Sequence, residues 1–175
     1  MVPLTSLAVA LIALGCFTAP TGRLAAMGVS AIQSVEGQQQ GVAGPISWWA
    51  GDMQLITKEN ADGAYDLYVF TLVLKNTGTV PVTLTRMEWN VTDQGIIRGS
   101  PYSQAASWVL APQGERRSTW PYSLICPMLY TCAPTQFAEP SWTFRFTGTT
   151  AQGQPVDVPI AVTLPAQTLR TRFKW

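Results

Sequence analysis

The sequence predicts an all-β protein built as an antiparallel β-sandwich of about seven to eight strands. Three observations favour this class. Apolar and polar residues alternate with period two in several stretches beyond residue 45. Residues typical of turns separate these stretches about every 8–15 residues. No stretch between them shows the spacing of an amphipathic helix.

The chain begins with an apolar segment that is typical of export. Residues 2–15 carry no charged side chain, and the run is short for a membrane span but suits the core of a signal peptide. It ends in ALGC at Cys16, which resembles the lipobox of bacterial lipoproteins, in which the cysteine is lipidated. A plain signal cut after residues 29–31 and an uncleaved anchor reaching Pro20 are the alternatives. We therefore interpret residues 1–16 as a signal peptide or lipoprotein signal that exports the chain or tethers it to a membrane.

Residues 17–44 are predicted to be a flexible linker. They are mostly small and polar, with EGQQQG at 36–41, and lack the apolar density that stabilises a fold. The β-sandwich domain is expected over residues 45–166, where the strand pattern begins with 46–49 and 53–58.

The centre of the domain is the stretch 65–93, interpreted as two long strands joined by a short turn. Both arms are rich in Tyr, Val, Phe, Leu and Thr, and NTGT at 76–79 supplies the turn. The first arm is apolar on both faces, so this strand is expected to be central in its sheet. In the second arm the apolar parity switches near residues 85–87, which predicts a β-bulge or a change of sheet there.

Two further strand pairs complete the domain. The stretches 107–111 and 115–125 are expected to form a hairpin around PQG at 112–114. The stretches 142–147 and 156–164 alternate cleanly between apolar and polar residues, as strands with one buried face do. Pro159 cannot donate a backbone hydrogen bond, so the last strand is predicted to lie at a sheet edge.

Composition limits the chemistry. Charged residues make up 12% of the chain, and the formal net charge is +1, which argues against nucleic acid as a partner. The chain has no histidine, which removes the commonest general base and the commonest transition-metal ligand. No nucleophile or phosphate-binding motif occurs. We therefore expect no cofactor, no metal site and no catalytic residues, so the protein is not expected to be an enzyme.

Cysteine gives the sharpest local signal. If Cys16 belongs to the export signal, Cys126 and Cys132 remain. An even pair this close in an oxidising compartment predicts a disulfide. Two reduced thiols and a metal site are the alternatives, although a structural zinc ion takes four ligands and the chain offers no histidine.

The chain has seven tryptophans, which is many for its length. Three of them lie in alternating strand patterns and are expected in the core: Trp89, Trp120 and Trp142. Adjacent residues of a strand point to opposite faces, so Trp48 and Trp49 cannot both point inward. The candidate contacts to a ligand or partner are Trp48, Trp49, Trp108 and Trp175. Packing at the surface without a ligand is the alternative.

Residues 167–175 are expected to form a basic and aromatic C-terminal tail. Basic and apolar residues alternate in LRTRFKW at 169–175. In extended form such a segment can rest on anionic lipid or pair with the edge of a partner's sheet, and a frayed end is the alternative.

The domain resembles a class of exported immunoglobulin-like domains. The pattern consists of YxLxVxTxV at 65–73, NxG at 76–78, VxL at 82–84 and LAPxG at 110–114. It is similar to the late-embryogenesis-abundant type 2 domain, also called the water-stress and hypersensitive-response domain, and to the FxLYD-like domain of bacterial lipoproteins. The Asn-Pro pair of these domains is replaced by Asn76-Thr77. The resemblance spans residues 46–164 and implies an antiparallel immunoglobulin-like β-sandwich with a binding or structural role.

Together these features predict a non-enzymatic interaction or structural module, exported to the periplasm or cell surface and tethered to a membrane. Its expected partners are the membrane, through the N-terminus, and another protein or a component of the cell envelope. One alternative is a carbohydrate-binding module, which is favoured if Trp48, Trp49 and Trp108 are coplanar and exposed. Another is a small hydrolase that uses paired carboxylates, which would require such a pair in a cleft.

Overall fold

The protein is all-β in the part of the chain that the structure describes, as predicted. The structure is a computed structural model that describes residues 28–60, 63–98, 101–127 and 132–174. Its strands, in chain order, are β1 (Gly28–Ser34), β2 (Gln39–Ala43), β3 (Ile46–Asn60), β4 (Gly63–Asn76), β5 (Val82–Asp93), β6 (Ile96–Ile97), β7 (Tyr102–Leu110), β8 (Glu115–Tyr122), β9 (Ile125–Pro127), β10 (Thr135–Ala138), β11 (Pro140–Thr150), β12 (Pro155–Thr163), β13 (Gln167–Arg170) and β14 (Arg172–Lys174).

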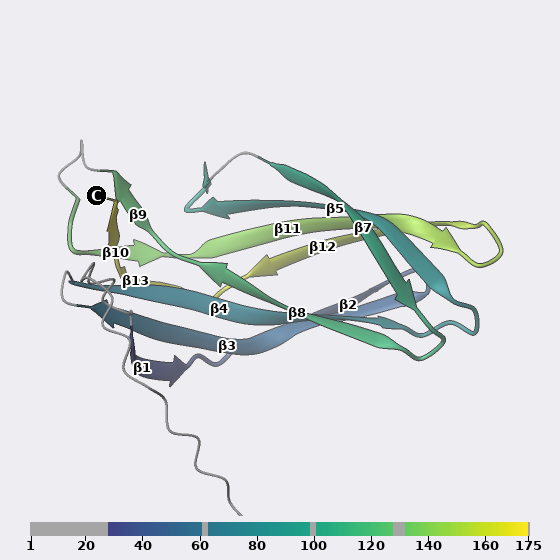
Figure 1. The fold of residues 1–175 in the computed structure, drawn as a ribbon, viewed down its shortest axis with the longest axis horizontal. Helices are drawn as coiled ribbons and strands as arrows, with labels where there is room; N and C mark the ends of the chain where they lie inside the picture. The colour runs from purple at the N-terminus through teal and green to yellow at the C-terminus, as the bar shows by residue number, and fades with distance from the viewer. Residues whose placement is uncertain (1–27, 61–62, 99–100, 128–131, 175) are drawn as a thin grey trace, which may run out of the picture.

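Two antiparallel sheets pack face to face as a β-sandwich (Figure 1). Sheet A has the order β1-β3-β4-β8, and β2 also pairs with β3. Sheet B has the order β12-β11-β5-β6, and β7 also pairs with β5. Within the described residues each of these sheets holds five strands, so the sandwich has ten, more than the predicted seven to eight, and β10-β13 and β9-β14 form two further two-stranded sheets. The additional strands are β1, β2 and the two-residue β6.

The inward-facing side chains of both sheets form one core. β4 supplies the fully buried Tyr68, Phe70 and Leu72, and its central place between β3 and β8 is the one predicted from its two apolar faces. From sheet B, Trp142, Phe144 and Phe146 stack in sequence, with ring centroids 5.7 and 6.1 Å apart. The other two tryptophans expected in the core pack against it: Trp89 and Trp120.

The stretch 65–93 is not the hairpin that the sequence suggested. β4 pairs with β3 and β8 in sheet A, whereas β5 pairs with β11, β6 and β7 in sheet B. The connection between β4 and β5 therefore crosses from one sheet to the other. The stretches 102–110 and 115–122 are joined in the same way, because β7 belongs to sheet B and β8 to sheet A. A short turn is compatible with both arrangements, so local sequence did not distinguish them.

The fully buried side chain of Asn76 stabilises both connections between the sheets, from β4 to β5 and from β7 to β8. Its Nδ2 atom donates to the carbonyl oxygens of Val80, Leu110 and Ala111 at 2.8, 3.1 and 3.2 Å. Its Oδ1 atom accepts a hydrogen bond from the backbone of Gly78 at 2.9 Å. One amide thus satisfies the backbone of two connections that are distant in the sequence.

The irregularity predicted near residues 85–87 is a β-bulge in β5. The register shifts between Leu84 and Arg86 against both β7 and β11, so Thr85 is the extra residue. β11 passes very close at this point, because a Cβ atom on Gly148 would collide with the carbonyl oxygen of Thr83. The close approach of two backbones therefore requires glycine at position 148.

The pair β11–β12 is confirmed as an antiparallel hairpin, with Trp142 opposite Val162 and Phe146 opposite Val158. β12 pairs only with β11 among the described strands, so the edge position predicted from Pro159 is also confirmed.

Residues 28–43 correct the prediction of a flexible linker. β1 and β2 both pair with β3. Val35 and Ala43 pack against the core, and the side chain of Gln39 exchanges hydrogen bonds with the backbone of Thr163 in β12. These residues have little intrinsic strand preference, so pairing with β3 supplies their order. The predicted signal segment at residues 1–16 lies outside the described residues.

The C-terminal residues also correct the prediction of a tail. β13 pairs with β10, and β14 pairs in parallel with β9, at one end of the sandwich (Figure 1). The fully buried Leu169 belongs to the core. The carboxylate of Asp66 in β4 accepts hydrogen bonds from the backbone of Arg170 and the hydroxyl of Thr57, both at 2.8 Å. Long-range contacts of this kind are not visible in the local pattern of residues.

Candidate functional site

The outer face of sheet A carries the candidate site, and Trp49 marks its position. In β3, Ile46 and Ala50 are fully buried in the core and Trp48 packs against it. Side chains alternate along a strand, so Trp49 points to the opposite, outer face. The expectation that the two adjacent tryptophans face apart is confirmed.

A glycine determines how Trp49 lies. Gly51 is on the same face of β3, and a Cβ atom there would collide with three atoms of the Trp49 ring. The indole ring therefore lies down along the sheet, over the backbone of Gly51. Trp48 does the same on the inner face, where its indole nitrogen would lie 2.7 Å from a Cβ atom on Gly41. Each ring occupies the space that an absent side chain leaves.

A hollow of about 590 Å³ opens beside the Trp49 ring. Its lining comes from Gly41 and Trp48 and from two rows of cross-strand neighbours that run over β2, β3, β4 and β8. One row is Gln40, Trp49, Val73 and Arg117, and the other is Val42, Ser47, Lys75 and Glu115. The buried side chain of Val73 continues the apolar floor next to Trp49, and polar side chains surround both. An apolar floor with a few polar groups is the usual construction of a binding pocket.

A second hollow, of about 490 Å³, continues along the same face. Its outward-facing lining includes Ser34, Gln54, Val69, Thr71 and Thr119. Thr71 pairs with Gly51 on one side and Thr119 on the other, so this hollow begins at the row over which the Trp49 ring lies.

A β-bulge in β3 shapes the far part of the second hollow. The register of β3 against β4 shifts between Gly51 and Gln54, and Asp52 has a φ of 50° there. The bulge turns the exposed Asp52 side chain to the rim of the second hollow.

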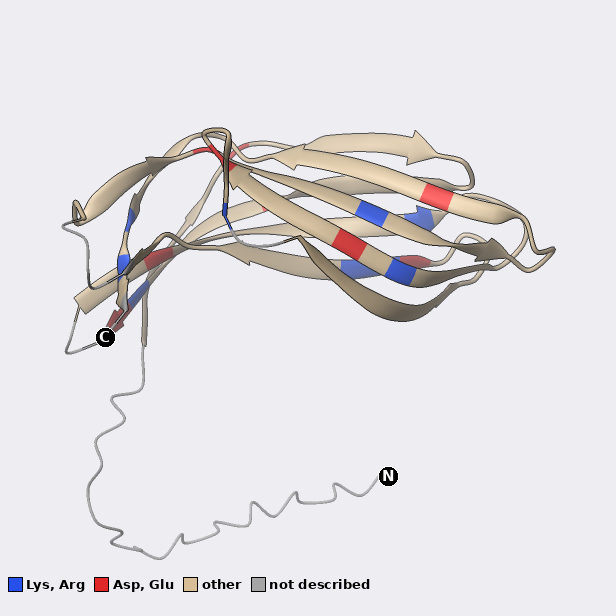
Figure 2. Cartoon of the chain, turned by 90° about the horizontal axis from the view of Figure 1, so that it is seen from above, with Lys and Arg blue, Asp and Glu red and all other residues tan. Residues whose placement is uncertain are grey.

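The charges of the two hollows balance. The walls carry two cations, Lys75 and Arg117, and two carboxylates, Glu115 and Asp52. The Nε atom of Arg117 donates to Glu115 at 3.3 Å, and both side chains are largely exposed. Figure 2 shows the same mixture over the part of the chain that the structure describes, with basic and acidic residues interspersed along the sandwich. The face therefore lacks the one-signed field that attracts a polyanion.

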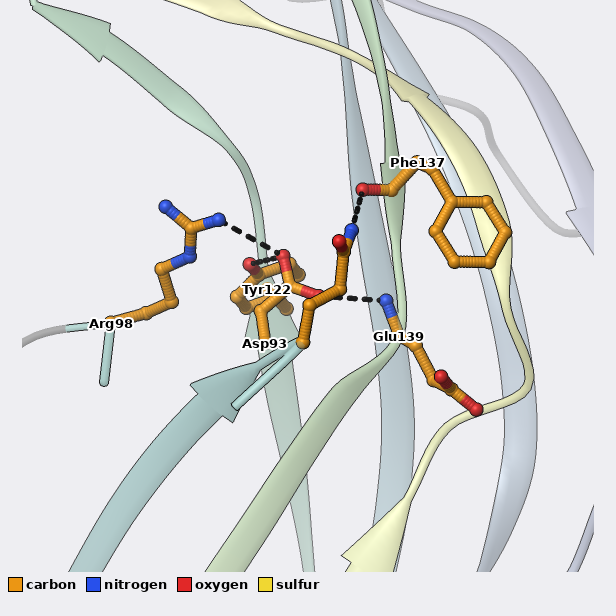
Figure 3. Close-up of polar contacts among 6 residues, drawn as sticks. Asp93, Arg98, Tyr122, Phe137 and Glu139 are labelled. Carbon is orange, nitrogen blue, oxygen red and sulfur yellow. Dashed lines mark hydrogen bonds and ion pairs between the residues drawn. The ribbon is translucent and has the colours of Figure 1, made fainter. Parts of the chain in front are cut away.

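A second cluster of polar groups surrounds Asp93, at the end of β5 (Figure 3). Asp93 is fully buried. Its carboxylate accepts hydrogen bonds from the hydroxyl of Tyr122 at 2.7 Å and the backbone of Glu139 at 2.8 Å, and Arg98 lies at 3.5 Å. The Gln94 side chain adds a hydrogen bond of 2.8 Å to the carbonyl of Phe137.

The Asp93 cluster holds parts of the fold together. It joins β5, β6 and β8 to the segment that leads from β10 into β11. Burial, together with the hydrogen bond to the neighbouring Asp93 carboxylate, raises the pKa of Tyr122 well above its ordinary value. Both carboxylate oxygens have partners within the protein, as do those of Asp66. Neither buried aspartate is thus presented to a substrate as half of a carboxylate pair.

The other predicted contact residues do not join Trp49. Trp108 in β7 packs against the core, 5.7 Å from Phe146, and the guanidinium of Arg116 lies 4.1 Å from its ring centroid. Trp48 faces the core. The common exposed platform of Trp48, Trp49 and Trp108 is therefore not formed, and Trp175 and Cys16 lie outside the described residues.

The sulfur atoms of Cys126 and Cys132 lie at disulfide-bonding distance, as predicted, and their Cα atoms are 6.1 Å apart. Cys126 lies in β9, opposite Phe173 of β14. The bridge thus sits next to the strand pair that holds the end of the chain.

The described residues offer neither a metal cluster nor a membrane-spanning helix. They contain no group of three or more His, Cys, Asp or Glu side chains placed to hold a metal ion. None of their segments forms a helix with the length and apolar character needed to span a membrane.

Comparison with known proteins gives no family. No family model and no curated protein matches the chain. One similar solved chain is the X-ray structure of Northeast Structural Genomics Consortium target SoR45, with 14% identity and a TM-score of 0.47 over 71% of this chain and 91% of that chain. A likeness of this size carries no argument about function. The resemblance to late-embryogenesis-abundant type 2 and FxLYD-like domains stays a prediction.

Proposed function

We propose that the protein is a non-enzymatic binding module whose ligand or partner docks on the outer face of sheet A around Trp49. One observation carries the proposal: the indole ring lies over Gly51 at the floor of a hollow with polar walls. Burying an aromatic ring of this size under a ligand is strongly favourable, and the surrounding polar groups supply orientation.

The module acts in the periplasm or at the cell surface, tethered to a membrane through a lipid on Cys16. Its partner is a component of the cell envelope or another exported protein. The proximity of Cys126 and Cys132 supports this compartment, because disulfides persist where the surroundings are oxidising. The sandwich belongs to the immunoglobulin-like type in this proposal.

Photo-crosslinking in a bacterial host tests the binding face. Val42 and Val109 are a matched pair, since they are 72% and 68% exposed and lie on different sheets. Val42 lines the Trp49 hollow, whereas Val109 lies in β7 and is not part of it. Each position is replaced in turn with p-benzoyl-phenylalanine in the full chain.

Crosslinks to an envelope component from position 42, with none from position 109, are the expected result. Trp49→Ala should abolish those from position 42. Equal crosslinking from both positions, or none from either, would reject the outer face of sheet A as the binding surface.

The tether has its own test, which is fractionation of cells that express the full chain. Cys16→Ser should release the protein from the membrane fraction, because it removes the proposed lipid attachment. A mutant that stays with the membranes would show that another feature holds it there.

A further inference from the structure

We propose that the outer face of sheet A binds an uncharged carbohydrate chain, with Trp49 as its stacking platform. The inference rests on the proposed function, because it names the ligand class for the same surface. Four properties of the face lead to it: the fully paired backbone of its central strands, the orientation of one aromatic ring, the polar side chains around that ring, and the charge balance.

The backbone of this face is already engaged. At the rows that line the first hollow, β3 and β4 are paired on both sides in antiparallel ladders, so the N–H and C=O groups of these two central strands bond to neighbouring strands, whereas β2 and β8 pair on one side only. An extended peptide recognises a sheet by adding to a free edge. A ligand that lies across the middle of this face meets side chains only. It must therefore offer both an apolar surface for a ring and groups that bond to side chains.

The Trp49 ring is suited to stacking from one side. Gly51 provides the bare backbone beneath the ring, and the ring is half-buried at the floor of the hollow. The face of an indole is the negative part of its quadrupole, so it attracts polarised C–H bonds. One side of a pyranose ring presents such C–H bonds, while its hydroxyl groups point outward around the edge.

The side chains around the ring match those hydroxyl groups. Gln40 and Arg117 lie in the same cross-strand row as Trp49, and Thr71 and Thr119 lie in the next row. The amide of glutamine and the hydroxyls of threonine can each donate and accept, as a sugar hydroxyl does, and the arginine donates. Such groups fix the orientation of a sugar without requiring it to be charged.

The charges of the two hollows and the length of the lined surface narrow the class of ligand further. The two cations and two carboxylates of the hollows cancel, which favours a neutral chain over an acidic one. The lined rows extend along β4 from Lys75 to Val69, which is about 20 Å at the rise of a β-strand. The Trp49 ring lines the first hollow and lies over Gly51, in the row where the second hollow begins, so a linear oligosaccharide following the strands would stack one of its units on it.

Titration calorimetry with the full chain tests the inference. The probes are neutral cello-, chito-, xylo-, laminari- and malto-oligosaccharides, with oligogalacturonides as the acidic comparison. At least one neutral series should bind, and the acidic series should bind more weakly. Trp49→Ala should weaken binding about tenfold or more, as loss of an aromatic anchor does. Phe137→Ala is the matched control, because it removes an exposed aromatic ring from β10, outside both hollows, and should leave binding unchanged.

Two further variants keep the test valid if Trp49→Ala disturbs folding. Gly51→Ala retains the indole but displaces it, since the added Cβ atom collides with the ring, and it should also weaken binding. Thr119→Ala removes the hydroxyl and the methyl group of an exposed side chain and should weaken binding moderately. Binding of a neutral oligosaccharide that is unchanged by all three variants would overturn the inference, and so would the failure of every neutral series to bind. If no neutral series binds but position 42 still crosslinks to an envelope component, the carbohydrate is rejected and the binding face is retained. If position 42 gives no crosslink either, the carbohydrate and the binding face are both rejected.

Discussion

Replacing Asp93 with alanine should destabilise the fold more than most single substitutions, because three groups lose their partner at once. The Tyr122 hydroxyl and the Glu139 amide, at 2.7 and 2.8 Å, would be left without an acceptor. Leaving a buried polar group unpaired costs about 1–3 kcal/mol. The Arg98 contact, at 3.5 Å and partly exposed, adds little. We expect a loss of about 3–5 kcal/mol, a large part of the roughly 5–15 kcal/mol that stabilises a typical domain.

Asp93→Asn separates the contribution of the negative charge to stability from the contribution of the hydrogen bonds. The amide oxygen can still accept from Glu139, and the Tyr122 hydroxyl can turn to accept from the amide nitrogen. We therefore expect a loss of about 1–3 kcal/mol, smaller than for alanine. Asp157→Asn is the control, because it also removes a carboxylate bonded to an arginine but lies at the surface, and little change is expected.

Urea unfolding followed by tryptophan fluorescence measures all three variants. The expected order of stability loss is Asp93→Ala, then Asp93→Asn, then Asp157→Asn. A loss below about 1 kcal/mol for Asp93→Ala would refute the view that the cluster in Figure 3 holds the fold together. Equal losses at Asp93 and Asp157 would refute the role given to burial.

Three further predictions concern stability. Gly148→Ala should cost several kcal/mol or prevent folding, because the new methyl group meets the backbone of β5; a change within about 0.5 kcal/mol would exclude that close contact. A chain starting at residue 45 should unfold at lower urea than one starting at residue 28, since it lacks β1 and β2; equal midpoints would show that these strands add no stability. Burial raises the pKa of Tyr68 from 10.0 to about 12 and also raises the pKa of Tyr122. The two neutral hydroxyls therefore contribute their full stability to the folded state below pH 10, and this contribution is lost as the pH rises through 10 to 12 and beyond. Tyr68→Phe should make the alkaline loss of stability shallower, and an unchanged pH profile would contradict this assignment.

The sequence predicted the strands of the sandwich best where one face of the strand is exposed to solvent and the other is buried. Clean alternation placed β11 and β12, Pro159 marked an edge, and the switch of parity located the bulge at Thr85. These features depend on side-chain period and on backbone donors, which are local properties.

The connections between strands could not be predicted in the same way. Asn76 favours a sheet crossing through hydrogen bonds to residues 110 and 111, and nothing near position 76 indicates those partners. β1 and β2 are ordered because they pair with an edge of β3, although most of their own residues are small or polar. β13 and β14 likewise depend on distant pairing. In each case tertiary contacts override a weak local preference.

The candidate site was predicted in part. The adjacency of Trp48 and Trp49 showed that one ring must face outward, and the structure identifies it as Trp49. The grouping with Trp108 failed, because strand β7 turns that ring to the core. Gly51 was the missed signal: a glycine two positions after a tryptophan on the same face leaves room for the ring to lie down.

The role of Trp49 as the contact surface is tested most directly by the tryptophan indole resonances of the full chain. Trp142 is an internal control, since it lies in β11 of sheet B, is buried in the core and lines neither hollow. On addition of a neutral oligosaccharide that binds in calorimetry, the Trp49 indole resonance, assigned through Trp49→Phe, should shift while that of Trp142 stays in place. Saturating oligosaccharide that leaves the Trp49 resonance unmoved would contradict the account.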